Sequence, residues 1–273
     1  MRPTALTIAG SDSGGGAGVQ ADLKTFHAFG VFGTSVVTAV TAQSTMKVLG
    51  VHQVPPSMVA LQIDAVLDDI GADAVKTGML ATPEHVEVVA ERLAEHVGVN
   101  IKNRSIVVDP VMAAKGGTLL LSPDGIEVLR RRLLPIARLV TPNADEAEAL
   151  GADKIRGIDS MCEAARRIHG LGPRWVLIKG GHVDVEEGMA VDILFDGERF
   201  QELRGPRIDT RHTHGTGCAL SAAIAAGLAI GKEVDSAVLD AKAWLSRALT
   251  CAFVPGRGEG RGCPDHAVEP ESG

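Results

Sequence analysis

The sequence predicts a three-layer α/β/α fold with a mainly parallel central sheet, and three observations support it. Short β-branched runs alternate with longer segments of helical periodicity, the pattern of parallel strands joined by crossover helices. Several of these runs are apolar on both faces, as expected for strands buried between two helix layers. Residues 191–203 differ, because two strand-like runs flank Asp196-Gly197, which predicts an antiparallel hairpin at one sheet edge.

The individual elements follow in chain order. Strands are predicted at residues 6–9, 34–43, 74–78, 105–108, 138–141 and 175–178. Helices are predicted from residue 57, from Thr82-Pro83, from Ser122-Pro123, and at 159–171 and 236–253. Thr82 and Ser122 each place a capping hydroxyl before a proline at the first helical position. We expect residues 1–263 to form one domain and residues 264–273 to form a flexible tail.

Composition narrows the class of protein. The chain has 273 residues, 45% of them hydrophobic, and a net charge of −7, which disfavours nucleic acid and anionic membranes as partners. Four cysteines lack CxxC spacing and no apolar stretch is long enough to span a bilayer, so we expect a cytoplasmic protein with free thiols. A nucleotide ligand would require local backbone N–H groups, a lysine or Mg²⁺.

The strongest local motif is His214-Gly215-Thr216-Gly217-Cys218, which precedes an alanine-rich run. Glycines let consecutive N–H groups face outward, and the helix dipole adds positive potential, so the motif suits a phosphoryl group. A turn that merely starts a helix is an equally good interpretation of the glycines alone. At a helix start the Cys218 thiol is expected to have a lowered pKa, although a small buried hydrophobe is the alternative.

A glycine-rich loop follows the first predicted strand. Residues 16–21 match the GxGxxA pattern of dinucleotide-binding loops. That pattern also requires an acidic residue at the end of the second strand, where Thr41-Ala42-Gln43 stands instead. The dinucleotide interpretation is therefore weak, and the loop can equally admit a flat ring.

Three charged residues end or follow predicted strands. Asn143 and Glu146 have the spacing of a capping pair, but Glu146 could also lie near Mg²⁺, through water. Asp109 is a second candidate oxygen ligand, or else a turn residue before Pro110. Lys179 precedes two glycines and could reach a phosphate, or remain a solvated strand-end charge.

In combination these motifs resemble the hydroxymethylpyrimidine/phosphomethylpyrimidine kinases of the ribokinase-like superfamily. The resemblance covers nearly the whole chain. It is carried by the loop running into Gln20-Ala21-Asp22-Leu23-Lys24-Thr25-Phe26, by Ala42-Gln43, Lys76-Thr77-Gly78-Met79, Asp109-Pro110-Val111-Met112, Thr141-Pro142-Asn143-x-x-Glu146, Lys179-Gly180-Gly181-His182 and His212-Thr213-His214-Gly215-Thr216-Gly217-Cys218.

The resemblance implies a kinase that uses Mg·ATP to phosphorylate hydroxymethylpyrimidine and then its monophosphate in thiamin biosynthesis, and a homodimer. It implies Cys218 as general base, and Gly215, Thr216 and Gly217 around the moving phosphoryl group. The implied ATP contacts include Lys179 and Thr213, with Mg²⁺ near Asp109 and Glu146. The implied substrate pocket is lined by Gly10, Asp22, Gln43, Met79 and Val108.

The sequence departs from the family pattern in three places. Ser13 stands where proline is common, Ser44 stands where asparagine is frequent, and the closing glycine motif is loosened between Gly258 and Pro264. The nearest rival is therefore a pyridoxal kinase on the same fold. Rivals of other classes are an NAD(P)-dependent oxidoreductase and a catalytically silent ligand-binding protein.

Overall fold

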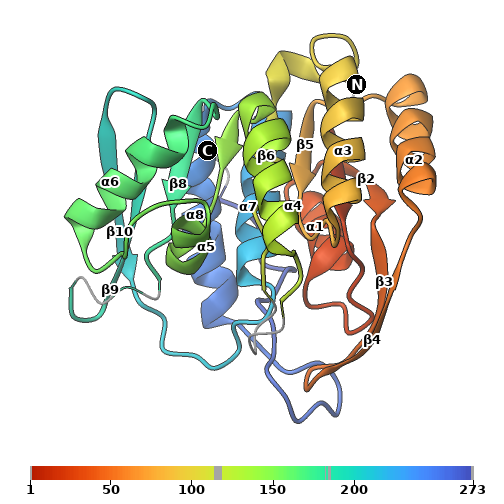
Figure 1. The fold of residues 1–273 in the computed structure, drawn as a ribbon. Helices are drawn as coiled ribbons and strands as arrows, with labels where there is room; N and C mark the ends of the chain where they lie inside the picture. Colours follow the sequence, from red (N-terminus) through yellow and green to blue (C-terminus); the bar gives the residue numbers. More distant parts are fainter. Residues whose placement is uncertain (1, 114–118, 182, 184–185, 272–273) are drawn as a thin grey trace.

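The computed structural model describes residues 2–113, 119–181, 183 and 186–271, and it confirms the three-layer fold (Figure 1). Eight strands form the main sheet in the order β10-β9-β8-β7-β6-β5-β1-β2. From β2 to β8 all neighbours are parallel, and β9 pairs antiparallel with β8 and β10. The strands are β1 (Thr4–Ala9), β2 (Phe32–Val37), β5 (Ala74–Thr77), β6 (Ile106–Val108), β7 (Leu139–Val140), β8 (Trp175–Ile178), β9 (Met189–Phe195) and β10 (Phe200–Pro206).

Helices cover both faces of this sheet (Figure 1). One layer holds α1 (Gly18–Ala28), α7 (Thr216–Ala229) and α8 (Val234–Thr250). The other holds α2 (Pro56–Asp69), α3 (Pro83–His96), α4 (Pro123–Val128), η2 (Leu129–Leu133), η3 (Leu134–Ile136), α5 (Ala144–Ala149) and α6 (Ile158–His169), and the short turn η1 (Lys102–Arg104) precedes β6.

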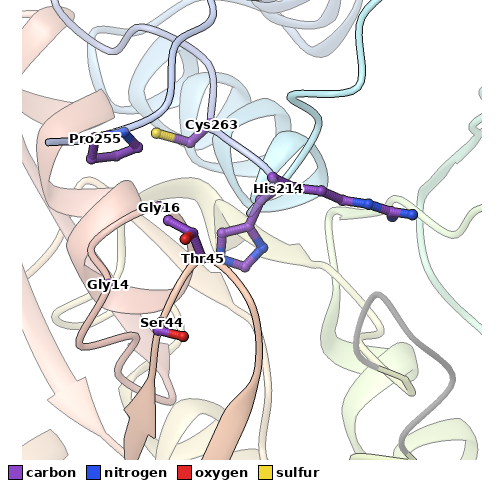
Figure 2. Close-up of a pocket in the computed structure, with 8 residues that line it drawn as sticks. Gly14, Gly16, Ser44, Thr45, His214, Pro255 and Cys263 are labelled. Carbon is purple, nitrogen blue, oxygen red and sulfur yellow. The ribbon is translucent and has the colours of Figure 1, made fainter. Parts of the chain in front are cut away.

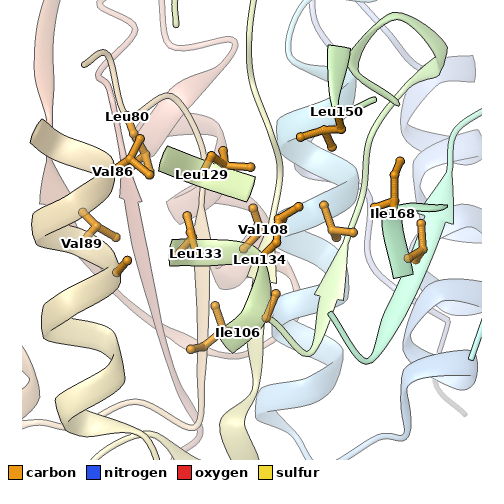
Figure 3. Packing of buried hydrophobic residues seen from close by; sticks show 14 of the residues in the cluster. Leu80, Val86, Val89, Ile106, Val108, Leu129, Leu133, Leu134, Leu150 and Ile168 are labelled. Carbon is orange, nitrogen blue, oxygen red and sulfur yellow. The ribbon is translucent and has the colours of Figure 1, made fainter. Parts of the chain in front are cut away.

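The core is built mainly from aliphatic side chains that alternate along the strands. In β6, Ile106 and Val108 pack toward α3, η2 and η3 (Figure 3), whereas Val107 packs toward α7 and α8. All three are fully buried. Burial on both faces explains why these runs show no polar alternation in the sequence.

The strand predicted at residues 34–43 is divided in the structure, which corrects that boundary. After β2 the chain leaves the main sheet at Thr38, whose N–H donates to the Ala9 carbonyl over 3.0 Å. It continues as β3 (Ala39–Gln43), which pairs antiparallel with β4 (Val48–Gln53) in a separate two-stranded sheet. Every residue of β4 is exposed, so the sequence shows no alternation of apolar and polar residues that would have predicted this strand.

The edge hairpin and the two proline-associated caps are confirmed. β9 and β10 turn around Asp196, whose carboxylate accepts the N–H groups of Glu198 and Arg199 at 2.8 and 2.6 Å. The Thr82 hydroxyl accepts the His85 N–H over 3.2 Å at the start of α3. Ser122 begins α4 in the same way.

The C-terminal residues differ from the expected flexible tail. Residues 264–271 pack along α8, where the Asp265 N–H donates to Ala248 and the Trp244 indole donates to the Val268 carbonyl at 2.9 and 2.7 Å. His266 is only 8% exposed. Across the described residues, no helix combines the length and apolarity that a membrane span requires.

Candidate active site

The glycine motif forms a tight turn at the N-terminus of α7. Gly215 has φ of 77°, and a Cβ placed on it would lie 1.8 Å from the Gly16 carbonyl oxygen, so the position accepts only glycine. The helical hydrogen-bond pattern begins at Ala219, whose N–H donates to the Gly215 carbonyl over 2.9 Å. The amides of Gly217 and Cys218 before it are therefore placed to receive an anion.

Two carboxylates and a lysine gather beside this turn. Lys179 Nζ lies 3.2 Å from Asp109 Oδ1 and 3.7 Å from Glu146 Oε2. A Cβ on Gly217 would lie 3.5 Å from the lysine nitrogen and 3.7 Å from Asp109 Oδ2. The structure thus brings three predicted residues together at the helix terminus: Asp109 directly after β6, Glu146 in the first turn of α5, and Lys179 directly after β8.

The capping interpretation of Glu146 is confirmed. Its carboxylate accepts the Asn143 N–H at 2.8 Å, while Asn143 Oδ1 accepts the Glu146 N–H at 2.9 Å, which completes a capping box for α5. Burial, together with the Asp109 charge, raises the pKa of Glu146 to about 7. Burial alone would lower the pKa of Lys179, but Asp109 and Glu146 raise it to about 12. A cationic lysine therefore lies between two acids.

Ser221 is a site residue that the sequence reasoning missed. Its hydroxyl donates to Asp109 Oδ2 over 3.1 Å, and the hydroxyl of Thr141 lies 3.5 Å from Oδ1. Ser221 is fully buried in an otherwise apolar helix. A lone serine in an alanine-rich run was the available signal, since a buried hydroxyl requires a partner.

The expected low pKa of Cys218 is wrong. Burial raises the pKa of this thiol to about 11, and the charge of Lys76 and the N–H of Gly18 lower it by less than burial raises it. The helix terminus therefore does not make Cys218 a thiolate at neutral pH by itself. A thiol with this pKa is a strong base once ionised, but only a small fraction is ionised at pH 7.

Behind the thiol, Lys76 and Asp22 form a fully buried ion pair of 2.8 Å. The Thr7 hydroxyl donates to the same Asp22 oxygen over 2.6 Å. Burial would lower the pKa of Lys76, but the Asp22 carboxylate raises it above the ordinary value. Asp22 was predicted to line the substrate pocket, and the structure places it beneath the loop that follows β1. The available signal in the sequence was Lys76 itself, because a lysine within a buried strand requires an acidic partner.

The other residues expected around the substrate lie at the same edge of the sheet. Gly10 faces Met79, because a Cβ on Gly10 would lie 2.4 Å from the Met79 methyl carbon. Val108 is the buried last residue of β6. Gln43 ends β3, and its backbone N–H donates to the Ser13 hydroxyl over 2.7 Å. His182, part of the Lys179 motif, lies outside the described residues.

Asp12 organises the glycine-rich loop, a role the sequence reasoning did not identify. Its two carboxylate oxygens accept the N–H groups of Gly14, Gly16 and Ala17 at 2.8, 3.1 and 2.9 Å. Its Oδ2 also lies 2.8 Å from Nε2 of His214. Burial would raise the pKa of Asp12, but His214 and the loop amides lower it below the ordinary value. Asp12 is therefore an ionised anchor of the loop.

Figure 2 shows a pocket where three segments meet over this anchor. The loop contributes Gly14 and Gly16, the β3–β4 turn contributes Ser44 and Thr45, and the C-terminal part of the chain contributes Pro255, Arg261 and Cys263 around His214. The loosened glycine motif packs against this turn. The Arg261 N–H donates to the Thr45 carbonyl over 3.1 Å, and a Cβ on Gly260 would clash with the same carbonyl oxygen.

A glycine-turned helix terminus, a lysine between two acids and a glycine-rich loop at the carboxyl ends of parallel strands together define a small-molecule phosphotransferase. The family model described as phosphomethylpyrimidine kinase matches residues 12–262. The chain therefore belongs to the phosphomethylpyrimidine kinase family.

Individual relatives agree with this assignment. The hydroxymethylpyrimidine/phosphomethylpyrimidine kinase of Streptomyces coelicolor is 49% identical over 94% of this chain and 93% of its own length. The thiamine biosynthesis bifunctional protein of Geobacter sulfurreducens is 51% identical over 95% of this chain, which spans only 51% of that longer protein. Among solved structures, the ADP complex of Bacillus subtilis pyridoxal kinase has a TM-score of 0.87 at 39% identity and covers 98% of both chains.

Proposed function

We propose that this chain transfers the γ-phosphoryl group of ATP to the hydroxymethyl group of 4-amino-5-hydroxymethyl-2-methylpyrimidine, and then to the resulting monophosphate, in thiamine biosynthesis. Family membership over residues 12–262 supports the reaction. The single structural observation that carries it is the glycine turn at the N-terminus of α7, where Gly217 lies beside Lys179 and Asp109. This arrangement can neutralise a phosphoryl group during transfer.

In the first step the alcohol oxygen forms a bond to the γ-phosphorus, the bond to the β–γ bridging oxygen breaks, and ADP leaves. The alcohol proton passes to a base, for which Cys218 is the candidate. In the second step an ionised phosphate oxygen attacks, and no base is required. The amides of Gly217 and Cys218 would hold the moving group in both steps, and Thr213 would contact ATP.

The donor set beside Lys179 suits Mg²⁺. Asp109 and Glu146 provide hard oxygen ligands, and Mg²⁺ typically takes one or two carboxylates together with phosphates and water. Among the described residues, no group of three or more His, Cys, Asp or Glu side chains could hold a metal ion. The bound ion would neutralise triphosphate charge, and Lys179 would share that role.

The substrate ring would pack against Gly10, Met79 and Gln43, with Val108 and Asp22 also lining the pocket. Asp22 Oδ1 is buried and has no hydrogen-bond partner among the described residues. A buried carboxylate oxygen without a partner is costly, and a donor group of the substrate would satisfy it.

A direct assay of ADP release tests the function, with hydroxymethylpyrimidine, its monophosphate and pyridoxal as parallel acceptors. We expect turnover with both pyrimidines. Pyridoxal is the second candidate acceptor, because a structural neighbour is a pyridoxal kinase. Turnover with pyridoxal alone would replace the proposed substrate, and absence of ADP release with all three would reject the kinase.

We also propose that the chain acts in the cytoplasm as a homodimer. The four cysteines are free thiols, as a reducing compartment would keep them. The β3–β4 hairpin carries exposed apolar side chains on both of its faces, among them Val40, Val48, Leu49 and Val51 at 51, 38, 71 and 48% exposure. An apolar patch of this kind favours burial against a second copy.

A further inference from the structure

His214 lies between the two halves of the site and touches a group on each. Its Nε2 atom is 2.8 Å from Asp12 Oδ2 in the glycine-rich loop. The same Nε2 atom is 3.3 Å from the terminal amide nitrogen of Gln43 on the β3–β4 hairpin. One ring nitrogen therefore has two polar neighbours. Only one combination of imidazole tautomer and Gln43 amide orientation gives both neighbours a favourable contact.

Asp12 decides where the imidazole proton resides. This carboxylate already accepts three backbone N–H groups, and its pKa lies below the ordinary value, so it is ionised and can only accept. A lone pair on Nε2 facing a carboxylate oxygen at 2.8 Å would be repelled. The ring nitrogen Nε2 must therefore carry the proton and donate it to Asp12.

This tautomer in turn decides which end of the Gln43 amide faces the ring. A protonated Nε2 cannot accept from an NH₂ group, whereas an amide oxygen at the same position accepts a second branch of the same hydrogen bond. The two ends of a side-chain amide have the same shape, and the hydrogen-bond network selects between them. The oxygen of Gln43 consequently faces His214, and the NH₂ group occupies the other arm of the amide.

We propose that His214 is a positioning residue for substrate specificity, which orients the Gln43 amide so that its NH₂ group donates to a ring nitrogen of the acceptor. This inference rests on the proposed function. An aminopyrimidine presents a ring nitrogen acceptor beside an amino donor, and the Gln43 oxygen retains a lone pair for that amino group. A ring without this adjacent pair leaves the fixed amide partly unsatisfied, which costs affinity.

The packing around His214 keeps the ring in place. A Cβ on Gly16 would lie 2.7 Å from the imidazole, and the His214 backbone N–H donates to the Gly262 carbonyl over 3.1 Å. Figure 2 shows the ring beside Gly16 and Thr45. The residue that follows is Gly215, the N-cap of α7.

The kinetic test compares His214→Ala with His212→Ala. His212 is a matched control because it lies in the same segment and its Nδ1 accepts the Gly262 N–H, without the Asp12 and Gln43 contacts of His214. We expect His214→Ala to lower the ratio of kcat/KM for hydroxymethylpyrimidine over pyridoxal by about tenfold, and His212→Ala to leave that ratio unchanged. Equal losses for both acceptors in His214→Ala would overturn the proposal.

Gln43→Glu tests the orientation itself. The glutamate oxygen still accepts from His214, but the NH₂ donor is lost, so kcat/KM for the pyrimidine should fall by about tenfold or more. Wild-type kcat/KM for the pyrimidine in this variant would contradict the assigned orientation.

A measurement without turnover keeps this inference separate from the proposed function. ¹⁵N-histidine NMR of the wild-type protein, with His214→Ala as the assignment control, should report a proton on Nε2 of His214. A proton on Nδ1 with a bare Nε2 would overturn the inference whichever acceptor the enzyme uses. Absence of ADP release with every acceptor, with the Nε2–H tautomer present, would reject the proposed substrate rather than the tautomer.

Discussion

For Cys218, the sequence motif predicted the position at the start of α7 correctly but predicted the wrong direction for the pKa shift. The helix terminus and Lys76 both favour the thiolate, yet burial outweighs them and raises the pKa to about 11. If this thiol is the base of the first step, that step must be limited by the small ionised fraction in the free enzyme. The positive charge of Lys76 would then stabilise a thiolate that is rarely populated.

A pH profile of the two steps tests this role. Below the pKa of about 11, the thiolate fraction rises about tenfold per pH unit. Between pH 7 and 9.5, where the monophosphate is already ionised, we expect the ratio of first-step to second-step kcat/KM to rise in the wild type. In Cys218→Ala the first step should fall roughly 10²–10⁴-fold and the ratio should become flat. Equal losses in both steps would indicate positioning.

Gly215 carries a prediction that depends on backbone shape alone. A Cβ at this position would lie 1.8 Å from Gly16, and φ of 77° strains any other residue. Gly215→Ala should lower kcat by about 10²-fold or more, since the amides behind it lose their alignment. The control is Gly157→Ala, where φ is −179° and no atom lies within 4 Å of the added Cβ. Similar activities in the two variants would count against the phosphate turn.

At the scale of elements, the C-terminal segment makes specific contacts with the helix layer. Residues 264–271 pack on α8, and the preceding Gly262 receives the His214 N–H. His266 is buried near Trp244 and Lys24, and its Nε2 has no partner among the described residues. Burial, together with the Lys24 charge, lowers its pKa to about 4.

This depressed pKa predicts acid sensitivity of the fold. The unfolded chain binds a proton at His266 near pH 6.5, and the folded chain only near pH 4, so stability is complete above about 6.5 and is lost as pH falls toward 4. His266 should contribute up to about 3 kcal/mol to this loss. Denaturant unfolding at pH 6.5 and 4.5 should show a smaller loss for His266→Gln, with the exposed His27→Gln as control. An equal loss in both variants would exclude His266 as the cause.

The β3–β4 hairpin is the element where sequence and structure differ most. β3 alternates between buried and exposed residues and was merged with β2, whereas β4 was missed because all of its residues are exposed. Yet the hairpin positions Gln43 and the Thr45 turn against the glycine-rich loop. A two-stranded sheet has little stability of its own. The hairpin therefore depends on its contacts with the rest of the chain.

For the whole molecule, the exposed apolar hairpin predicts self-association. Leu49 is 71% exposed, and Leu49→Lys would place a charge in the proposed interface. We expect sedimentation equilibrium to show a dimer for the wild type and a weakened dimer for this variant. Val99→Lys is the control, because Val99 is 79% exposed on the separate turn after α3. A monomeric wild type, or equal dissociation of both variants, would reject the hairpin as the interface.

The sequence by itself determined the layered fold and the family, and it named the polar residues that the fold brings together. Alternation of buried strands and capped helices is a local property, and so is a glycine turn before a helix, which is why Lys179, Asp109 and Glu146 could be named before they were seen to meet. Tertiary structure decided what depends on burial and on partners distant in the chain: the raised pKa of Cys218, the Lys76–Asp22 pair, and the contact of Asp12 and Gln43 with His214. Desolvation and hydrogen-bond geometry arise only when these segments pack together, so no local pattern contains them.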